Sequence, residues 1–310
     1  MKFKFQKPLT GIEIDGTFVK MVQVIKEKKN WRLIYWKSIP LPSDVLELSY
    51  KEENIMDPIL FRDTIQEVLK PTKTRVSRIG LSLPNEIIKV TIHRFNGLKE
   101  SEAKIEQLIR WKEKSSLPFP IEKAKVSTST FTHKDTGERS YLTAIAFSDV
   151  ITDYEMHFKR LKINPESIHP SGINQINFYI SRLGSSGITA FLGLFEKYFT
   201  FFVFEDSQLI FFRGKRRSFS FVHFLQEIDM TIELFKRDYP NKEIERLSFG
   251  SQVGLSQDLE QELKEYTYMD FTVLDENEII MTDSGLDEHG KKIDIAYYAS
   301  AIGAAQSLAG

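Results

Sequence analysis

One order of strands and helix occurs twice in this chain, and this repeat limits the possible folds more than any other feature. In the first half, three strand-like runs and a helix-like run cover 9–14, 18–25, 31–39 and 59–69. In the second half, the corresponding runs cover 188–194, 198–204, 208–213 and 221–237. Duplication of a meander followed by a helix predicts two related α/β lobes that face each other across a cleft. Two unrelated α/β domains with similar beginnings are the alternative.

Further strand-like and helix-like runs lie between the two halves, and they predict an inserted α/β subdomain. Strands are expected at 77–83, 87–95, 126–131 and 141–147, with helices at 102–114 and 150–161. We therefore expect a first lobe formed by 1–76 and 168–186, an insertion at 77–167, and a second lobe at 187–310.

The composition is that of a folded protein with balanced charge. The 310 residues include 42 basic and 43 acidic side chains, for a formal net charge of −1. This balance argues against a nucleic-acid binder, which normally carries a basic excess. Because the chain has no cysteine, disulfides and thiolate chemistry are excluded. No signal peptide is visible and no apolar run approaches the ~20 residues of a spanning helix, so we expect membrane contact only through partners.

The usual sequence signs of an enzyme are absent. The six histidines show no metal-ligand spacing, so we expect no metal site, and neither a Gly-x-Ser-x-Gly elbow nor a Walker loop is present. The run Arg213–Arg217 is the one basic cluster; a solvated strand end is expected, and a contact for lipid head groups or an acidic partner is the alternative. Trp111 is expected to pack a turn at Pro118-Phe119-Pro120 into the core, with a partner anchor as the alternative.

Five segments, in order along nearly the whole chain, resemble the PilM family of actin-like proteins from type IV pilus machines. They are Gly11–Lys20, Ile109–Glu122, Ala190–Arg213, Ile244–Gly254 and Ala299–Leu308. The segment at 109–122 is the most specific to that family. The others are shared with FtsA-like division proteins and with the cytosolic part of GspL. The resemblance implies an actin-like (ribonuclease H-like) two-lobed α/β fold with an inserted subdomain in the first lobe.

The resemblance also implies partners and a location. PilM-type proteins lie in the cytoplasm, peripheral at the inner membrane, and hold the cytoplasmic tail of PilN between the first lobe and its insertion. They link the inner-membrane ring to the rest of the machine, including a motor ATPase. The corresponding partner-binding residues here are Ile87, Ile88, Lys89 and Val90, because an exposed strand edge can accept an extended peptide.

The same resemblance implies a nucleotide site, but its residues depart from the family pattern. In the first phosphate loop, Glu13 and Asp15 replace aspartate and glycine, and Gly16 and Thr17 follow. In the second, Gly193 replaces aspartate and Phe195 replaces glycine. The adenosine loop keeps Gly250 and Gly254.

We therefore expect a degenerate site that does not hydrolyse ATP, with no required cofactor, although ATP and magnesium are possible ligands. At ~4 Å, a carboxylate and a phosphate charge repel by about 4 kcal/mol at an effective dielectric of 20. Asp-Gly is also a favoured hairpin dipeptide, so turn formation is the simpler interpretation of Asp15 and Gly16. The alternatives are a working PilM-type ATPase and the cytosolic domain of a longer GspL-like protein.

Overall fold

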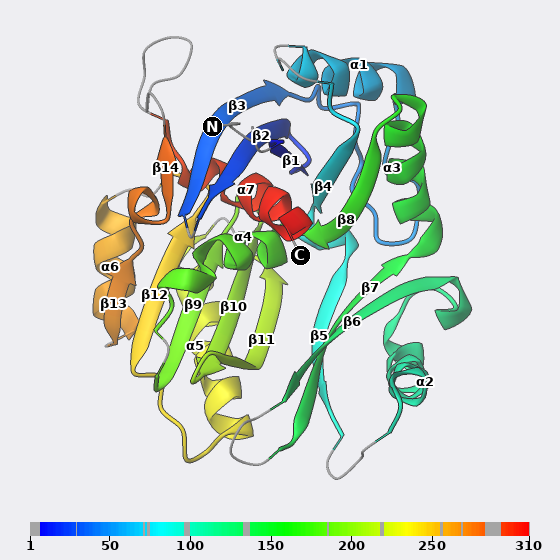
Figure 1. The fold of residues 1–310 in the computed structure, drawn as a ribbon. Coiled ribbons are helices and arrows are strands. Elements are labelled where there is room, and N and C mark those ends of the chain that lie inside the picture. Colours follow the sequence, from blue (N-terminus) through cyan, green and yellow to red (C-terminus); the bar gives the residue numbers. More distant parts are fainter. Residues whose placement is uncertain are drawn as a thin grey trace.

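A computed structural model provides the fold (Figure 1). It describes residues 7–28, 30–70, 72, 75–95, 100–132, 137–184, 186–217, 220–254, 257–267, 269–282 and 293–309.

Two large sheets repeat one plan. The first has the order β14-β3-β2-β1-β4-β8, formed by Ile280–Thr282, Asn30–Pro40, Phe18–Glu27, Leu9–Ile14, Arg78–Leu83 and Asn164–Pro170. The second has the order β11-β10-β9-β12-β13, formed by Gln208–Arg216, Tyr198–Glu205, Ile188–Leu194, Arg246–Ser251 and Asp270–Val273. In each, an antiparallel meander is extended by a parallel strand beside its first strand. The predicted duplication is therefore confirmed.

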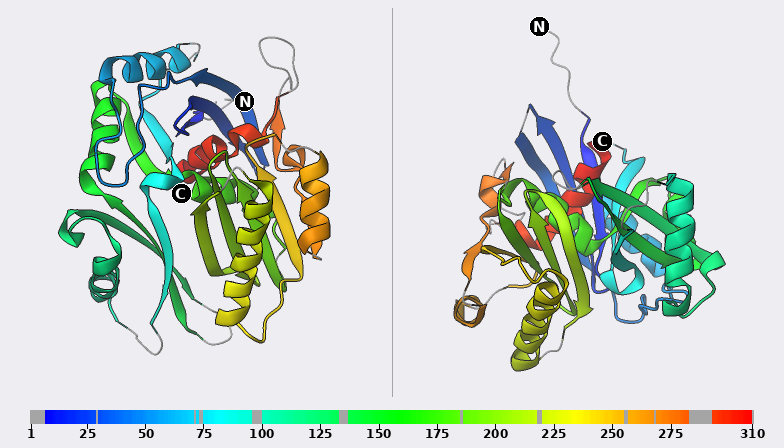
Figure 2. Two further views of the ribbon diagram at one scale, coloured as in Figure 1. Left: turned by 180° about the vertical axis from the view of Figure 1, so that it is seen from behind. Right: turned by 90° about the horizontal axis from the view of Figure 1, so that it is seen from below.

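Helices cover both faces of the sheets. On the outer face of the first sheet lie α1 (Pro58–Leu69) and α3 (Ser148–Arg160), and on that of the second lie α5 (Phe221–Asp238) and α6 (Gln257–Thr267). Between the sheets lie α4 (Ser171–Tyr179) and α7 (Ala299–Gln306), as Figures 1 and 2 show. The start of α1 follows from its sequence: the Asp57 carboxylate accepts hydrogen bonds from the N–H groups of Ile59 and Leu60, and Pro58 begins the helix.

Small residues allow α7 to lie directly on the first sheet. All but the last residue of α7 are buried. A Cβ at Gly11 would lie 1.9 Å from the carbonyl oxygen of Ala301, so only glycine fits at this position of β1. The small-residue segment near the end of the chain therefore packs between the two lobes.

The insertion is smaller than we predicted. Its separate sheet has the order β5-β7-β6, formed by Lys89–Arg94, Arg139–Phe147 and Ala124–Thr132, with α2 (Glu102–Glu113) on one face. By contrast, β4 and β8 pair within the first-lobe sheet, and α3 contributes to the first-lobe core. The insertion thus runs from β5 to β7 rather than over the whole of 77–167.

The prediction that Trp111 packs into the core is wrong, because this side chain is 79% exposed. In α2 the buried residues are Ile105, Ile109 and Glu113, at four-residue spacing. Trp111 lies two residues from Ile109, about 200° around the helix, and therefore points away from the sheet. Phe119 instead fills the small core beside Tyr50 and Phe147.

Candidate functional site

Asp15 closes the first loop on itself. Its Oδ1 accepts hydrogen bonds from the Thr17 N–H (2.9 Å), the Thr17 hydroxyl (2.9 Å) and the Phe18 N–H (2.7 Å). Gly16 has φ +96°, a conformation that side-chain-bearing residues rarely adopt. Asp15, Gly16 and Thr17 are thus held together as a hairpin turn.

Lys20 joins the two carboxylates of this loop. Its Nζ lies 2.9 Å from Asp15 Oδ2, 3.4 Å from Glu13 Oε2 and 3.9 Å from the centre of the Tyr297 ring. The Lys20 and Glu13 side chains are only 2% and 0% exposed. A buried ammonium therefore occupies the space between two acidic groups that would otherwise be available to a metal ion.

The pKa values follow from this arrangement. Burial alone would lower the pKa of Lys20, but the charges of Glu13 and Asp15 raise it above its usual value. Burial raises the pKa of Glu13, and Lys20 opposes that shift. Burial also tends to raise the pKa of Asp15, but Lys20 and the turn N–H groups lower it below its usual value.

The sequence contains a signal for the role of Lys20 that local patterns did not reveal. Once 15–17 is taken as the turn, hairpin pairing places Lys20 directly opposite Glu13 on the neighbouring strand. A buried acid opposite a buried lysine predicts an ion pair.

Gln252, which follows β12, reaches from the second lobe to the first. In the amide orientation that satisfies both of its ends, its nitrogen donates to Glu13 Oε1 (3.1 Å) and its oxygen accepts from the Ser300 N–H (2.9 Å). The Ser300 hydroxyl lies within hydrogen-bond distance of both the Gln252 amide oxygen (2.6 Å) and the carbonyl oxygen of Ser171 (2.9 Å). The Gln252 and Ser300 side chains, together with the Ser300 N–H and the Ser171 carbonyl, thus connect β1, α4, α7 and the second lobe.

The second loop is filled by a side chain from α4. A Cβ at Gly193 would lie 2.1 Å from Gln175 Oε1 and 2.5 Å from Thr200 Oγ1. Both side chains are buried, and these two oxygens have no hydrogen-bond partner among the described residues. Gly193 therefore occupies a place where an aspartate has no room unless Gln175 moves. The Phe195 side chain is also buried.

The adenosine loop shows the same kind of packing. A Cβ at Gly250 would lie 2.6 Å from the Tyr179 ring, so Gly250 allows that ring to lie against β12. A Cβ at Gly254, by contrast, would meet nothing within 4 Å. The seven residues expected to form a nucleotide site thus have three kinds of surroundings. Four belong to the hairpin closed by Asp15 and Lys20, which we call the sealed hairpin: Glu13, Asp15, Gly16 and Thr17. Gly193 and Gly250 are packing positions, and Gly254 is open.

This arrangement does not fit magnesium held by the two loops. The carboxylates of Glu13 and Asp15 already contact Lys20, Gln252 and the turn N–H groups, and the second loop has no carboxylate at Gly193. Magnesium is usually bound through one or two carboxylates together with water and phosphate oxygens.

An open groove lies between the insertion and the first lobe. Its volume is about 500 Å³. One wall is the face of the inserted sheet opposite α2, with Ala144 and Ala146 of β7 as its floor. The other wall is formed by α3 and β8. The groove is open because its floor residues are small.

Charged side chains meet across this groove. Lys125 of β6 and Glu155 of α3 form an ion pair at 3.0 Å. Arg110 of α2 also lines the groove, and its guanidinium donates to the carbonyl oxygens of Ile121 (3.1 Å) and Ala124 (3.3 Å). The groove therefore has an apolar floor and a polar margin, as ligand-binding sites commonly do.

The predicted partner residues occupy different environments. Ile88 lines the groove, and Val90 packs beside the first-lobe core. Ile87 is fully buried, and Lys89 turns toward Glu113, with its Nζ 2.7 Å from the carboxylate. Of these four residues, Ile88 lines the groove; the opposite wall was not predicted from the sequence, because α3 and β8 reach it only through tertiary packing.

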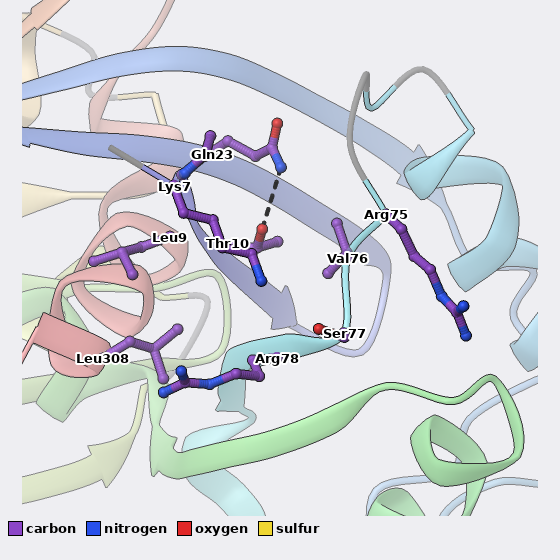
Figure 3. Close-up of a pocket in the computed structure, with 10 residues that line it drawn as sticks. Lys7, Leu9, Thr10, Gln23, Arg75, Val76, Ser77, Arg78 and Leu308 are labelled. Atoms are coloured by element: carbon purple, nitrogen blue, oxygen red, sulfur yellow. Dashed lines mark hydrogen bonds between the residues drawn. The ribbon is translucent and has the colours of Figure 1, made fainter. Parts of the chain in front are cut away.

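A smaller hollow of about 150 Å³ lies at the other end of β1 from the Asp15 turn (Figure 3). At its base Gln23 Nε2 donates to Thr10 Oγ1 at 3.3 Å. Arg75 extends away from this pair in Figure 3, and Arg78 is ion-paired with Glu166. These basic groups do not converge on one position, so they do not form an anion site.

The basic cluster at 213–217 is paired on the surface. Arg213 and Lys215 both form ion pairs with Glu227 of α5, and the Arg217 Nε donates to the carbonyl oxygen of Glu196. This pairing agrees with a strand end that needs no partner. Among the described residues, no helix is long and apolar enough to span a membrane.

Comparison with solved structures identifies the fold. A chain from a PilM–PilN type IV pilus biogenesis complex matches with a TM-score of 0.81 and 16% identity, covering 96% of this chain and 98% of that one. A Bacteroides thetaiotaomicron protein with an actin-like ATPase fold and unknown function gives 0.53, with 13% identity and coverage of 97% and 98%. The cytoplasmic domain of EpsL, an inner-membrane component of the Vibrio cholerae type II secretion system, gives 0.54, with 6% identity and coverage of 97% and 95%. The predicted actin-like fold is confirmed.

A family model described as type IV pilus assembly protein PilM matches residues 11–218. No match was found among curated proteins. Because the family model spans more than half of the 310 residues, this chain belongs to the PilM family of type IV pilus assembly proteins.

Proposed function

We propose that this chain is a cytoplasmic platform of a type IV pilus machine, associated with the inner membrane through a partner. It binds the cytoplasmic tail of a PilN-like inner-membrane protein in the groove between the insertion and the first lobe. It does so without hydrolysing ATP.

The observation that carries this proposal is the groove. It has an apolar floor at Ala144 and Ala146, and β8, an edge strand of the first-lobe sheet, forms part of its wall. Pro165 and Pro170, which lack N–H groups, are tolerated in β8 because it is an edge strand. An extended peptide can add to such an edge, with alternate side chains directed to the floor. The likeness to a PilM chain solved with PilN supports this kind of occupant.

A matched pair of substitutions tests the groove. Ala144→Leu adds three carbons to the floor and should weaken binding of a synthetic PilN-like tail peptide at least tenfold, or about 1.4 kcal/mol. Thr130→Leu places the same side chain at an exposed position of β6, on the opposite face by strand alternation, and should leave the affinity unchanged. Equal affinity for wild type and Ala144→Leu, with both folded, would place the peptide elsewhere.

The second part of the proposal, absence of hydrolysis, rests on the first loop. Lys20 forms ion pairs with both Glu13 and Asp15 from within the chain and lies where a metal ion would otherwise balance these carboxylates. Millimolar Mg-ATP should therefore leave the melting temperature unchanged, since only a ligand that binds the folded state raises it. A saturable increase in melting temperature with phosphate release would instead indicate a working PilM-type ATPase.

A further inference from the structure

The face of the inserted sheet that lines the groove also contacts the second lobe. Ile88 lies at the groove, whereas Ile92, four residues further along the same face, packs against the core cluster that includes Leu209. Phe131 and Leu142 pack there as well. Strand β5 lies beside β11 of the second lobe, as Figure 1 shows. One sheet therefore contacts both lobes.

Arg94, at the end of β5, makes the polar part of this contact. Its guanidinium carbon lies 4.4 Å from the centre of the Tyr239 ring, and its Nη2 donates to the carbonyl oxygen of Ile210 at 2.5 Å. The Tyr239 hydroxyl donates to the same carbonyl at 2.7 Å. Tyr239 is held in turn by Phe235, with ring centres 5.2 Å apart. We call Arg94, Tyr239 and Ile210 the clasp.

We infer that Arg94 is a positioning residue that couples the groove to the relative position of the two lobes. Ile88 and Ile92 are separated by four residues of extended chain, about 13 Å at ~3.3 Å per residue. A movement of the second lobe that carries the clasp with it therefore tilts β5 and, with it, Ile88, which directly precedes β5 and lines the groove.

This coupling must act in both directions. If the clasp holds the sheet in the position that accepts a peptide, a bound peptide must also favour the closed clasp by the same factor. Coupling between sites typically corresponds to a 5- to 150-fold change in affinity. When Arg94 is removed, we expect the affinity for the peptide to change by about fivefold, the lower limit of this range. The change is small because the apolar contacts of Ile92, Phe131 and Leu142 remain.

The clasp can be tested without any ligand. Because the natural sequence has no cysteine, Ser115→Cys in the insertion and Gln226→Cys in the second lobe can be spin-labelled selectively, and both positions are exposed. Pulsed electron–electron double resonance measures the distance between the two spin labels. It should give one narrow distance distribution in the otherwise unchanged chain and a broader distribution after Arg94→Ala. Arg94→Lys keeps a cation over Tyr239 and should restore most of the narrow distribution. Arg237→Ala is the matched control, because Arg237 is 70% exposed and pairs with its neighbour Asp238.

The second arm tests coupling to the groove and rests on the proposed function. A PilN-like tail peptide should bind Arg94→Ala about fivefold more weakly than wild type or Arg237→Ala, and should narrow the distance distribution of Arg94→Ala. An unchanged distance distribution in Arg94→Ala would contradict the inference that Arg94 fixes the position of the insertion relative to the second lobe. A broadened distribution with unchanged peptide affinity would overturn the coupling. Failure of the peptide to bind wild type would instead contradict the proposed function, while the distance measurement would still decide the clasp.

Discussion

Lys20 and Glu13 lie directly opposite each other on β2 and β1, with Nζ and Oε2 3.4 Å apart and both side chains almost completely buried. Removing one partner of a buried ion pair leaves an uncompensated charge, which typically costs about 3–5 kcal/mol. Lys20→Met should therefore lower the free energy of unfolding by about that amount, as measured by urea denaturation at pH 7.

A double substitution serves as the control for this pair. Lys20→Met with Glu13→Gln removes both charges and should recover part of the lost free energy of unfolding. If the double variant were as unstable as the sum of the two single ones, the two residues would not interact, and the description of the sealed hairpin would be wrong.

Asp15 should make a contribution to stability that disappears in acid. Its folded pKa is lowered below 3.8, so the unfolded chain binds its proton more readily. The stabilisation is therefore fully present above the unfolded pKa and is lost as the pH falls through the folded pKa. Asp15→Asn should cost about 1.5–3 kcal/mol at pH 7, and the difference from wild type should shrink below about pH 4. Denaturant titrations of both proteins from pH 7 to pH 3 test this; a pH-independent difference would contradict it.

Restoring an aspartate at position 193 should not restore the second loop. The new Cβ would fall 2.1 Å from Gln175 Oε1, so Gly193→Asp should destabilise the protein by about 1–3 kcal/mol through overpacking. Gln175→Ala in the same chain should relieve part of this cost by vacating the space. Thermal unfolding of wild type and these two variants tests this, and a Gly193→Asp protein as stable as wild type would show that the loop has room for an aspartate.

The exposure of Trp111 predicts that it contributes little to stability. Because the side chain is 79% exposed, Trp111→Ala should change the free energy of unfolding by no more than about 0.5 kcal/mol. Phe119→Ala, in the small core beside Tyr50 and Phe147, should cost about 3–5 kcal/mol and serves as the comparison. A large loss for Trp111→Ala would support the packing role that the sequence first suggested.

Local patterns in the sequence predicted the duplicated meanders well. The strands at Leu9–Ile14 and Ile188–Leu194 have the predicted bounds, because short polar turns mark both ends of these apolar runs. The actin-like fold followed from the order of such runs and from the family resemblance. Parallel pairing was not predictable in this way. The places of β4 and β8 in the first sheet depend on contacts between distant segments, which leave no periodic signal in either strand.

The candidate site was only partly predictable, for similar reasons. The sequence shows that the usual phosphate-loop residues are replaced. It does not show which side chains of this chain fill the space that they leave. From the sequence, Gly193 and Gly250 were predicted to lie in nucleotide-binding loops. The structure shows instead that Gln175 and Tyr179 of α4 fill the space beside them. One wall of the groove was found through Ile88. The other wall depends on how α3 and β8 pack.

We propose that the groove binds a PilN-like tail without help from nucleotide. Calorimetric titration of that tail peptide into the purified chain, with and without millimolar Mg-ATP, tests this binding. We predict saturable binding of one peptide per chain with the same affinity in both conditions, and loss of that binding in Ala144→Leu. Binding that appeared only with Mg-ATP, or that survived Ala144→Leu unchanged, would contradict the claim.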